Sequence, residues 1–222
     1  MPSILTYAIG DIHGCHTLLV QLLEKIREHA GNQNHRLVFL GDYIDRGPNS
    51  ASVVSTVRYL QESGPDRVVC LKGNHEDMLL KSLDNADEAT QWLDNNGGYE
   101  TLNSYDGVVP DDVIEWLATL PTHHEDERRF YVHAGFLPGR PVADQTDRDK
   151  LWIKEPFLSA NEDFGKHVVH GHTPQMSGHP DVRQHRTNLD TAAVFARALT
   201  AGVFTNTQDS ATEFLQVIWS WD

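Results

Sequence analysis

Short apolar runs alternate with amphipathic segments along the first third of the chain, and this alternation narrows the possible folds more than any other feature. Three runs rich in β-forming residues are expected to be strands, over residues 4–9, 36–40 and 67–71. Three segments with apolar residues at helical spacing are expected to be helices, over residues 16–30, 50–62 and 76–83. This order of elements predicts a parallel βαβαβ unit.

The rest of the chain follows a different pattern. Residues 87–120 are expected to form a helical cap or insertion, broken by a glycine-rich turn. Later apolar runs predict a second half that is mostly β, with strands at 130–132, 167–169, around Leu189, at 198–204 and at 213–220. The acidic stretch 123–127 is expected to be an exposed loop. We therefore expect one mixed α/β domain over residues 1–222.

Polar, glycine-flanked clusters follow the predicted strands. Three lie in the first third of the chain, at 10–14, 41–47 and 73–76, and two clusters with histidine follow later strands, at 131–135 and 169–174. Ligands of parallel α/β sheets bind outside the carboxyl ends of the strands, so we expect these clusters to converge on one site. The glycines suit the sharp turns by which the backbone leaves a strand.

Carboxylate, imidazole and amide side chains dominate these clusters, and paired cysteines are absent from them. This donor set favours Mn²⁺, Fe or Zn²⁺ over a thiolate-type structural zinc site. Asp11 and His13 stand two residues apart, so both can point to one side of an extended segment. The clusters offer more ligands than one metal needs, and we infer a binuclear site, which suits in-line displacement at phosphorus.

A phosphate substrate also explains three polar residues that are not needed as ligands. The guanidinium fork of Arg46 matches phosphate oxygens. His75 stands next to a candidate ligand and is expected to protonate the leaving oxygen. Asp45 is expected to orient the His75 ring and raise its basicity.

The composition limits the partners and the compartment. The 222 residues carry a formal net charge of −14, which should repel nucleic acid and anionic membranes, so neither is an expected partner. Cys15 and Cys70 cannot form a disulfide framework and suit a reducing cytosol. No stretch has the length of a signal or membrane span, and we expect a cytoplasmic protein. The oligomeric state stays open.

The strings GDIHG, GDYIDRG and GNHE, followed by VHAG and HGHTP, resemble the bacterial, lambda-phosphatase-like branch of the PPP-type metallophosphatases, a group of serine/threonine protein phosphatases. The resemblance runs from about residue 7 to the DTAAVF stretch at 190–195. It implies a calcineurin-like metallophosphoesterase β-sandwich flanked by helices. It also implies two metals, with the ligands Asp11, His13 and Asp42 for the first and Asp42, Asn74, His133 and His172 for the second. In that family His75 would be the acid, Asp45 its orienting partner and Arg46 a phosphate ligand.

Some positions depart from the family pattern or stay open. A second phosphate-binding arginine is common in a Trp-x-Arg string, whereas this chain has Lys154, which keeps the charge but loses the bidentate fork. Either phosphate binding is weaker or a remote residue such as Arg183 or Arg186 assists. Ala192 stands where glycine is frequent, which suggests a packing change. His170 competes with His172 for one ligand role and is assigned a structural one. We expect Arg46, Lys154 and Asn74 to contact the substrate.

The resemblance favours a phosphomonoesterase that hydrolyses phosphoserine or phosphothreonine in proteins, with phosphotyrosine left open, by direct attack of a metal-bridging water. Mn²⁺ is the expected metal, and phosphorylated protein or peptide is the expected partner. One alternative is a dinucleoside polyphosphate hydrolase of the same superfamily, against which Asp45 and Glu76 argue because that branch typically lacks both. Another is a metal-bound binding module without activity, which the presence of His75 and Asp42 disfavours.

Overall fold

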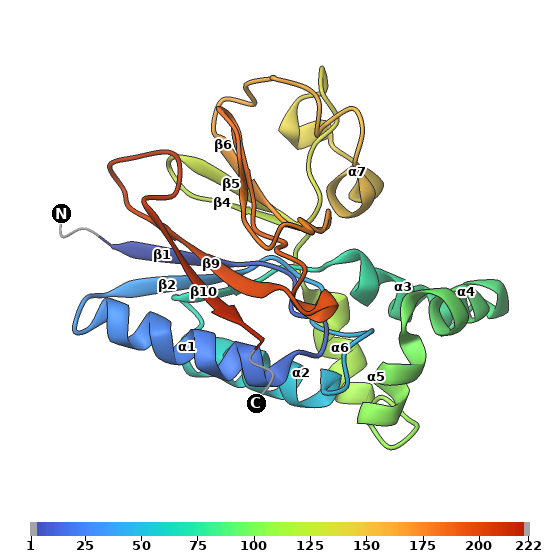
Figure 1. The fold of residues 1–222 in the computed structure, drawn as a ribbon. Helices are drawn as coiled ribbons and strands as arrows, with labels where there is room; N and C mark the ends of the chain where they lie inside the picture. Colours follow the sequence, from blue (N-terminus) through green and yellow to red (C-terminus); the bar gives the residue numbers. More distant parts are fainter. Residues whose placement is uncertain (1–3, 220–222) are drawn as a thin grey trace.

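Two five-stranded β-sheets form the centre of the computed structural model, which describes residues 4–219 (Figure 1). Sheet A has the strand order β10-β9-β1-β2-β3. Its strands are β1 (Leu5–Ile9), β2 (His35–Phe39), β3 (Val68–Cys70), β9 (Ala198–Phe204) and β10 (Glu213–Ile218). Strand β1 is parallel to β2 and β2 to β3, which confirms the predicted βαβαβ unit, whereas β9 runs antiparallel to both β1 and β10.

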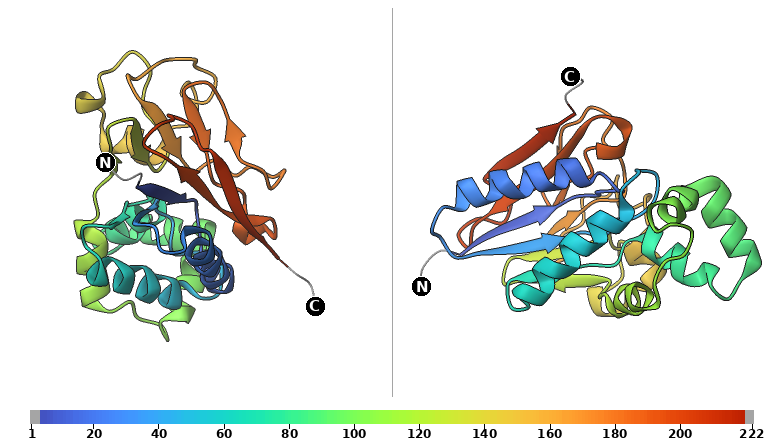
Figure 2. Two further views of the ribbon diagram at one scale, coloured as in Figure 1. Left: turned by 90° about the vertical axis from the view of Figure 1, so that its left-hand side faces the viewer. Right: turned by 90° about the horizontal axis from the view of Figure 1, so that it is seen from below.

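The two amphipathic segments of this unit are helices α1 (His16–Ala30) and α2 (Ser50–Ser63). Both lie across the outer face of sheet A (Figure 2). Alternate residues of β1 face opposite sides of the sheet, so Tyr7 and Ile9 pack in the helix-facing core while Ala8 belongs to the core between the sheets. The apolar side chains of the strands and those of the two helices thus pack together in one core layer.

Sheet B lies against the other face of sheet A and has the order β4-β5-β6-β8-β7. Its strands are β4 (His123–Glu125), β5 (Arg129–Val132), β6 (His167–His170), β7 (Asp181–Val182) and β8 (Arg186–Asn188). The core between the sheets takes side chains from both, namely Ala8, Val38, Leu40, Leu71, Tyr131, Val169, Leu189 and Phe204. This two-sheet arrangement with outer helices is the expected mixed α/β sandwich.

The last two strands differ from the prediction of a separate β half, because β9 and β10 join sheet A rather than sheet B. All seven residues of β9 are buried, so this strand needs neighbours on both edges and cover on both faces.

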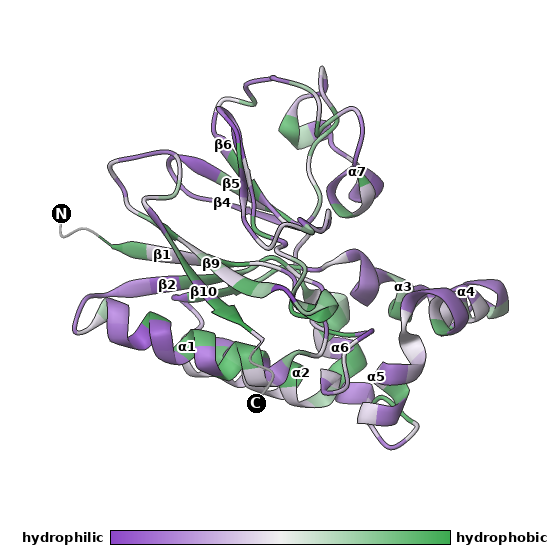
Figure 3. Ribbon diagram, in the orientation of Figure 1, coloured by the Kyte–Doolittle hydropathy of each residue, from purple (hydrophilic) through white to green (hydrophobic). Residues whose placement is uncertain are grey.

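The stretch 123–127, which was expected to be an exposed loop, begins with an edge strand, β4, in which His123 and His124 are half-buried. Figure 3 shows β9 and β10 as largely hydrophobic, while α1 alternates between hydrophilic and hydrophobic residues.

The predicted helical insertion consists of three helices, α4 (Ala86–Asn96), α5 (Gly98–Ser104) and α6 (Asp111–Thr119). Together with α3 (Asn74–Ser82) they cluster at one end of the sheets (Figure 1). The sequence pattern did not predict helix α7 (Asp147–Trp152) or the 3₁₀ turns η1 (Val142–Asp144) and η2 (Ala193–Phe195). Over residues 4–219, no helix has the length and apolar character needed to span a bilayer.

Candidate metal centre

The five glycine-flanked clusters meet where strands of both sheets end. Those of the first third follow β1, β2 and β3, and those with histidine follow β5 and β6. The topology therefore joins loops that are far apart in sequence, as the strand-end argument predicts. The structure brings all the predicted ligands to this junction, namely Asp11, His13, Asp42, Asn74, His133 and His172.

The carboxylate of Asp42 lies between two sets of imidazoles. Its Oδ2 is 3.3 Å from Nε2 of His13 and 4.0 Å from Nε2 of His75, and its Oδ1 is 3.4 Å from Nε2 of His133. Burial acts to raise the pKa of Asp42, but the three imidazoles outweigh burial and hold that pKa well below its usual value. Asp42 thus has one carboxylate oxygen facing each set, which is the position that a bridging ligand requires.

The amide oxygen of Asn74 faces two of these rings. Its Oδ1 is 2.8 Å from Nε2 of His133 and 2.9 Å from Nδ1 of His172, and the two ring centroids are 5.1 Å apart. In the described part of the chain, two groups bring their ligand atoms within 4.8 Å of one another and could hold a metal ion. They are His13 with Asp42 and His75, and Asp42 with His133 and His172.

Backbone carbonyls fix the proton positions of two of these histidines. A carbonyl oxygen can only accept, so Nδ1 of His13 donates to Ile44 at 2.8 Å and Nδ1 of His133 donates to Leu40 at 2.9 Å. When such a ring is neutral, its Nε2 presents a lone pair to the cluster. The lone pair of His133 faces the oxygens of Asn74 and Asp42, so three acceptors face one another.

Divalent cations fit this arrangement. A cation would turn the mutual repulsion of the facing acceptors into coordination, and oxygen and imidazole donors suit Mn²⁺, Fe or Zn²⁺. In addition, Nε2 of His172 is buried without a hydrogen-bond partner among the described residues. We therefore read the cluster as a metal site of the predicted donor chemistry.

Asp11 lies at the junction, but its carboxylate is turned toward the backbone. It accepts a hydrogen bond from the His172 N–H at 3.0 Å and belongs to neither metal-holding group. Burial raises the pKa of Asp11, and the nearby carboxylates of Asp190 and Asp42 raise it further. The role of Asp11 as a ligand of the first metal therefore stays a prediction. His75 belongs to the first group by distance alone, because an Nε2 that coordinates a cation cannot also deliver a proton.

Strained backbone concentrates at the same junction. Five residues without glycine's freedom have positive φ there, namely His13 (45°), Asp42 (53°), Asp45 (71°), Arg46 (67°) and His172 (65°). Two glycines let carboxylates approach the backbone. A Cβ on Gly73 would lie 2.2 Å from Oδ1 of Asp42, and a Cβ on Gly171 would lie 2.0 Å from Oδ1 of Asp11.

The pair expected to deliver a proton is present and buried. Nδ1 of His75 donates to Oδ2 of Asp45 at 2.6 Å, and the two residues are 1% and 0% exposed. Burial lowers the pKa of His75 despite the nearby carboxylates. Because Asp45 occupies Nδ1, the nitrogen that faces the cluster is Nε2. Asp45 thus holds the ring in the orientation that the sequence argument expects.

The predicted phosphate-binding cations are placed less uniformly. The guanidinium of Arg46 donates to Nε2 of His13 at 2.8 Å, inside the cluster. Lys154 is exposed, yet its charge is close enough to contribute to the lowered pKa of His172, after the larger effects of burial and of the neighbouring imidazole. The remote candidates Arg183 and Arg186 both pair with an aspartate of β7 instead.

Three residues at the site were missed by the sequence argument. Asp190 is a further buried carboxylate at the cluster, and burial raises its pKa to about 6. It follows β8 two residues after the strand ends, so the strand-end rule applied to that strand would have found it. Trp92 and Thr101 come from the helical insertion and donate hydrogen bonds to Asp45. Neither carries a local signal of such a role.

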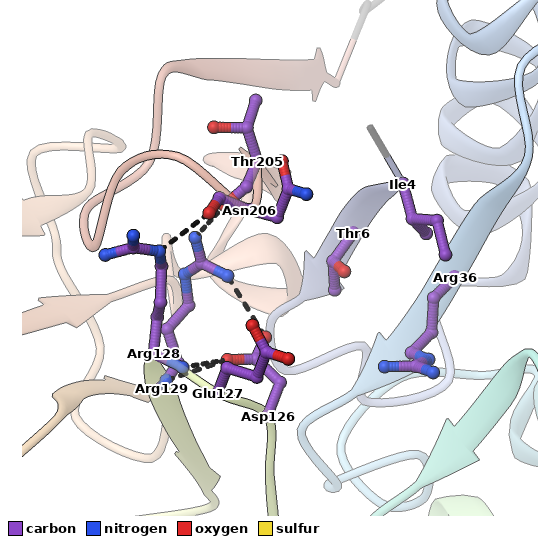
Figure 4. Close-up of a pocket in the computed structure, with 9 residues that line it drawn as sticks. All are labelled: Ile4, Thr6, Arg36, Asp126, Glu127, Arg128, Arg129, Thr205 and Asn206. Carbon is purple, nitrogen blue, oxygen red and sulfur yellow. Dashed lines mark hydrogen bonds and ion pairs between the residues drawn. The ribbon is translucent and has the colours of Figure 1, made fainter. Parts of the chain in front are cut away.

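A separate cavity of about 230 Å³ lies at the opposite end of β1, near Ile4 and Thr6 (Figure 4). Arg129 stands beside it, but its guanidinium already donates to Asp126 and to backbone carbonyls, including that of Asp209. The cavity lies away from the metal centre, and none of the predicted site residues lines it.

Comparison with known proteins agrees with this geometry. The family model described as calcineurin-like phosphoesterase matches residues 4–196. A symmetrical bis(5'-nucleosyl)-tetraphosphatase of Marinomonas sp. is 36% identical over 142 residues, which cover 60% of this chain and 45% of that protein. An asymmetrical bis(5'-nucleosyl)-tetraphosphatase of Oceanobacillus iheyensis is 27% identical, with 87% of this chain and 86% of that protein covered. The chain thus spans about half of the first relative and most of the second.

Solved structures share the fold. A structure described as a candidate diadenosine tetraphosphatase has a TM-score of 0.68 at 23% identity and covers 100% of this chain and 97% of its own. A serine/threonine phosphatase of Saccharomyces cerevisiae has a TM-score of 0.64 at 14% identity, with 100% and 81% covered. The relatives named above are tetraphosphatases, so the comparisons do not support the narrower expectation of a serine/threonine protein phosphatase. With its family match and its strand-end cluster of aspartate, histidine and asparagine, the chain belongs to the calcineurin-like phosphoesterases.

Proposed function

We propose that this protein hydrolyses dinucleoside polyphosphates, with two divalent cations, Mn²⁺ first among them, held by the cluster around Asp42. The main observation in favour of phosphoester chemistry is the buried Asp42 carboxylate, which has an imidazole near each of its two oxygens. The choice of substrate is supported by the names of the relatives that align with this chain. The motifs alone favoured a protein phosphatase over a dinucleoside polyphosphate hydrolase, and this proposal reverses that order.

The roles of the side chains follow from their positions. Two bound cations would lower the pKa of a shared water and polarise the phosphoryl oxygens. Arg46 reaches into the cluster and offers N–H donors to phosphate oxygens. His75 presents Nε2 to the cluster while Asp45 holds its Nδ1, so Nε2 is the atom that delivers a proton to the leaving oxygen. Lys154 adds positive charge at the exposed side.

A phosphoserine or phosphothreonine phosphatase is the second candidate, and one observation favours it. A buried acid such as His75 matters most when the leaving group is a poor one, and an alkoxide is a much poorer leaving group than a nucleotide phosphate. The Asp45–His75 pair is intact and buried, as that chemistry requires. In this case the partner would be a phosphorylated protein or peptide.

A substrate panel separates the two candidates. The enzyme is stripped with a chelator, reloaded with Mn²⁺, Fe²⁺ or Zn²⁺, and assayed on diadenosine tetraphosphate and on phosphoserine, phosphothreonine and phosphotyrosine peptides. We expect the highest kcat/KM with the dinucleotide and activity only after reloading. A higher kcat/KM on a phosphopeptide would select the second candidate, and a metal-loaded enzyme inert toward every compound would overturn both.

Replacement of the acid gives a finer test. His75→Asn should lower kcat by about 10²–10⁴ on a phosphoserine peptide, the usual contribution of general acid–base catalysis, and by less on diadenosine tetraphosphate. The bound metal, measured by elemental analysis, should show whether the loss is chemical, because a chemical loss leaves the metal content largely intact. Unchanged turnover on every substrate would end the role of His75 as the acid.

A further inference from the structure

The carboxylate of Asp45 is held by side chains from outside the strand-end motifs. Its Oδ2 accepts from Nε1 of Trp92 at 2.9 Å as well as from His75, and its Oδ1 accepts from Oγ1 of Thr101 at 2.6 Å. Trp92 is in α4 and Thr101 is in α5, so both belong to the helical insertion. Both are buried, with exposed fractions of 4% and 0%.

Thr101 contacts Asp45 at two points. Its Oγ1 accepts a hydrogen bond from the Asp45 N–H at 2.9 Å and donates to the Asp45 carboxylate. One hydroxyl group therefore ties the side chain of Asp45 to its own backbone. With Trp92 on the other oxygen, rotation of the carboxylate would break at least one buried hydrogen bond and leave a buried polar group without its partner.

The junction between α4 and α5 also touches the backbone of the motif. The carbonyl of Gly97 accepts from the Arg46 N–H at 3.3 Å, and a Cβ on Gly97 would lie 2.5 Å from that nitrogen. Asp45 and Arg46 both have left-handed backbones, at φ 71° and 67°, a conformation that is strained for a residue with a Cβ. Contacts from the insertion offset this strain. The glycine turn between α4 and α5 therefore packs directly against the loop that carries Asp45 and Arg46.

We propose that helices α4 and α5 form a positioning element for catalysis, in which Trp92 and Thr101 aim Asp45 at His75. This inference rests on the proposed function, because it assigns His75 the delivery of a proton to the leaving oxygen. Trp92 and Thr101 touch Asp45 and not the cluster, so they act through the orientation of the His75 ring. A small rotation of a catalytic group lowers the rate while substrate binding and metal content stay unchanged.

The test compares leaving groups. Thr101→Val keeps the shape and removes the hydroxyl, and Trp92→Phe removes the indole N–H. Each Mn²⁺-loaded variant is assayed on phenyl phosphate, which has the poorer leaving group, and on p-nitrophenyl phosphate. We expect kcat on phenyl phosphate to fall by about 10- to 100-fold, a much smaller fall on p-nitrophenyl phosphate, and KM within about twofold of wild type. Thr101→Ser keeps the hydroxyl and should retain most of the wild-type rate on phenyl phosphate.

Two references make the outcome decisive. Thr90→Val removes an exposed hydroxyl of α4 that bonds only within its helix, and it should behave as wild type. His75→Asn should show the same leaving-group dependence, only larger. If it does not, the acid role in the proposed function fails. If it does, while Thr101→Val and Trp92→Phe lose equally on both substrates or lose nothing, the positioning element is wrong. Should one variant fail to fold, the other still decides.

Discussion

Ala192 shows how a single residue can be strained by its own Cβ. Its φ and ψ are 61° and 44°, in the left-handed region, and its N–H donates to the buried carboxylate of Asp190. The sequence comparison interpreted alanine at this position as a packing change. The backbone supplies a further reason why glycine suits the position, since a left-handed residue with a Cβ costs roughly 1–2 kcal/mol.

We expect Ala192→Gly to stabilise the protein by about 0.5–1 kcal/mol, because relief of this strain exceeds the extra entropy that glycine loses on folding. The midpoint of urea unfolding of the metal-loaded protein measures it. Ala193→Gly is the matched control, since Ala193 is buried in the same turn and does not have a positive φ. It should destabilise. Equal losses for the two variants would show that Ala192 is not strained.

At the scale of elements, the start of α3 holds the loop that follows β2. Glu76 is fully buried in the first turn of α3, and its carboxylate accepts from the N–H groups of Asp42, Tyr43 and Gly73 at 2.9, 2.8 and 2.8 Å. Glu76 therefore supports the loop after β2 through its backbone N–H groups. The position of the Asp42 backbone depends on this contact between two elements.

Glu76→Gln should lower the free energy of unfolding by about 2–4 kcal/mol. The amide NH₂ of glutamine would face backbone N–H groups, so at least one buried donor loses its acceptor. Chemical denaturation measures the loss. Asp77→Asn, the next residue, breaks only a surface pair with Lys81 and should cost about 0.5 kcal/mol or less. A cost for Glu76→Gln no larger than that of Asp77→Asn would contradict the support role.

At the scale of the whole molecule, buried histidines make the fold sensitive to acid. Burial lowers the pKa of His167 to about 4 and that of His170 to about 3. An unfolded chain binds these protons near pH 6.5, well before the folded protein does. Stability from these groups is thus present above about pH 6.5 and is lost as the pH falls toward the folded values.

For His167 alone, the loss between pH 7 and pH 4.5 should be about 2–3 kcal/mol. His167→Asn should therefore lose less stability than wild type over this interval, by about that amount, in urea titrations at the two pH values. His167 is 4% exposed and lies outside the metal cluster, whereas His179 is exposed and provides the control, His179→Asn, which should keep the wild-type loss. Parallel pH dependence in all three proteins would show that His167 does not titrate as argued.

Local sequence patterns determine many of the secondary-structure elements and many of the residues at the site. Strand and helix periods gave the βαβαβ unit, and glycine-flanked polar residues after the strands gave the cluster around Asp42. These signals work because a pleated or helical backbone repeats every few residues and because parallel strands end on one side of a sheet. The motif resemblance added the roles of single ligands. The identity of the substrate lies in none of these local patterns.

Tertiary structure decided what depends on contacts between distant segments. Strands β9 and β10 return to sheet A because an apolar strand is stable wherever most of its surface is covered. The hydrogen bonds of Trp92 and Thr101 to Asp45 span about fifty residues of sequence, and no short pattern encodes such a pair. The carboxylate of Asp11 likewise turns to a backbone N–H supplied by a segment 161 residues away. The residues of each loop determine the local conformation of that loop. Which loops come together at the site is determined by the packing of the two sheets as a whole.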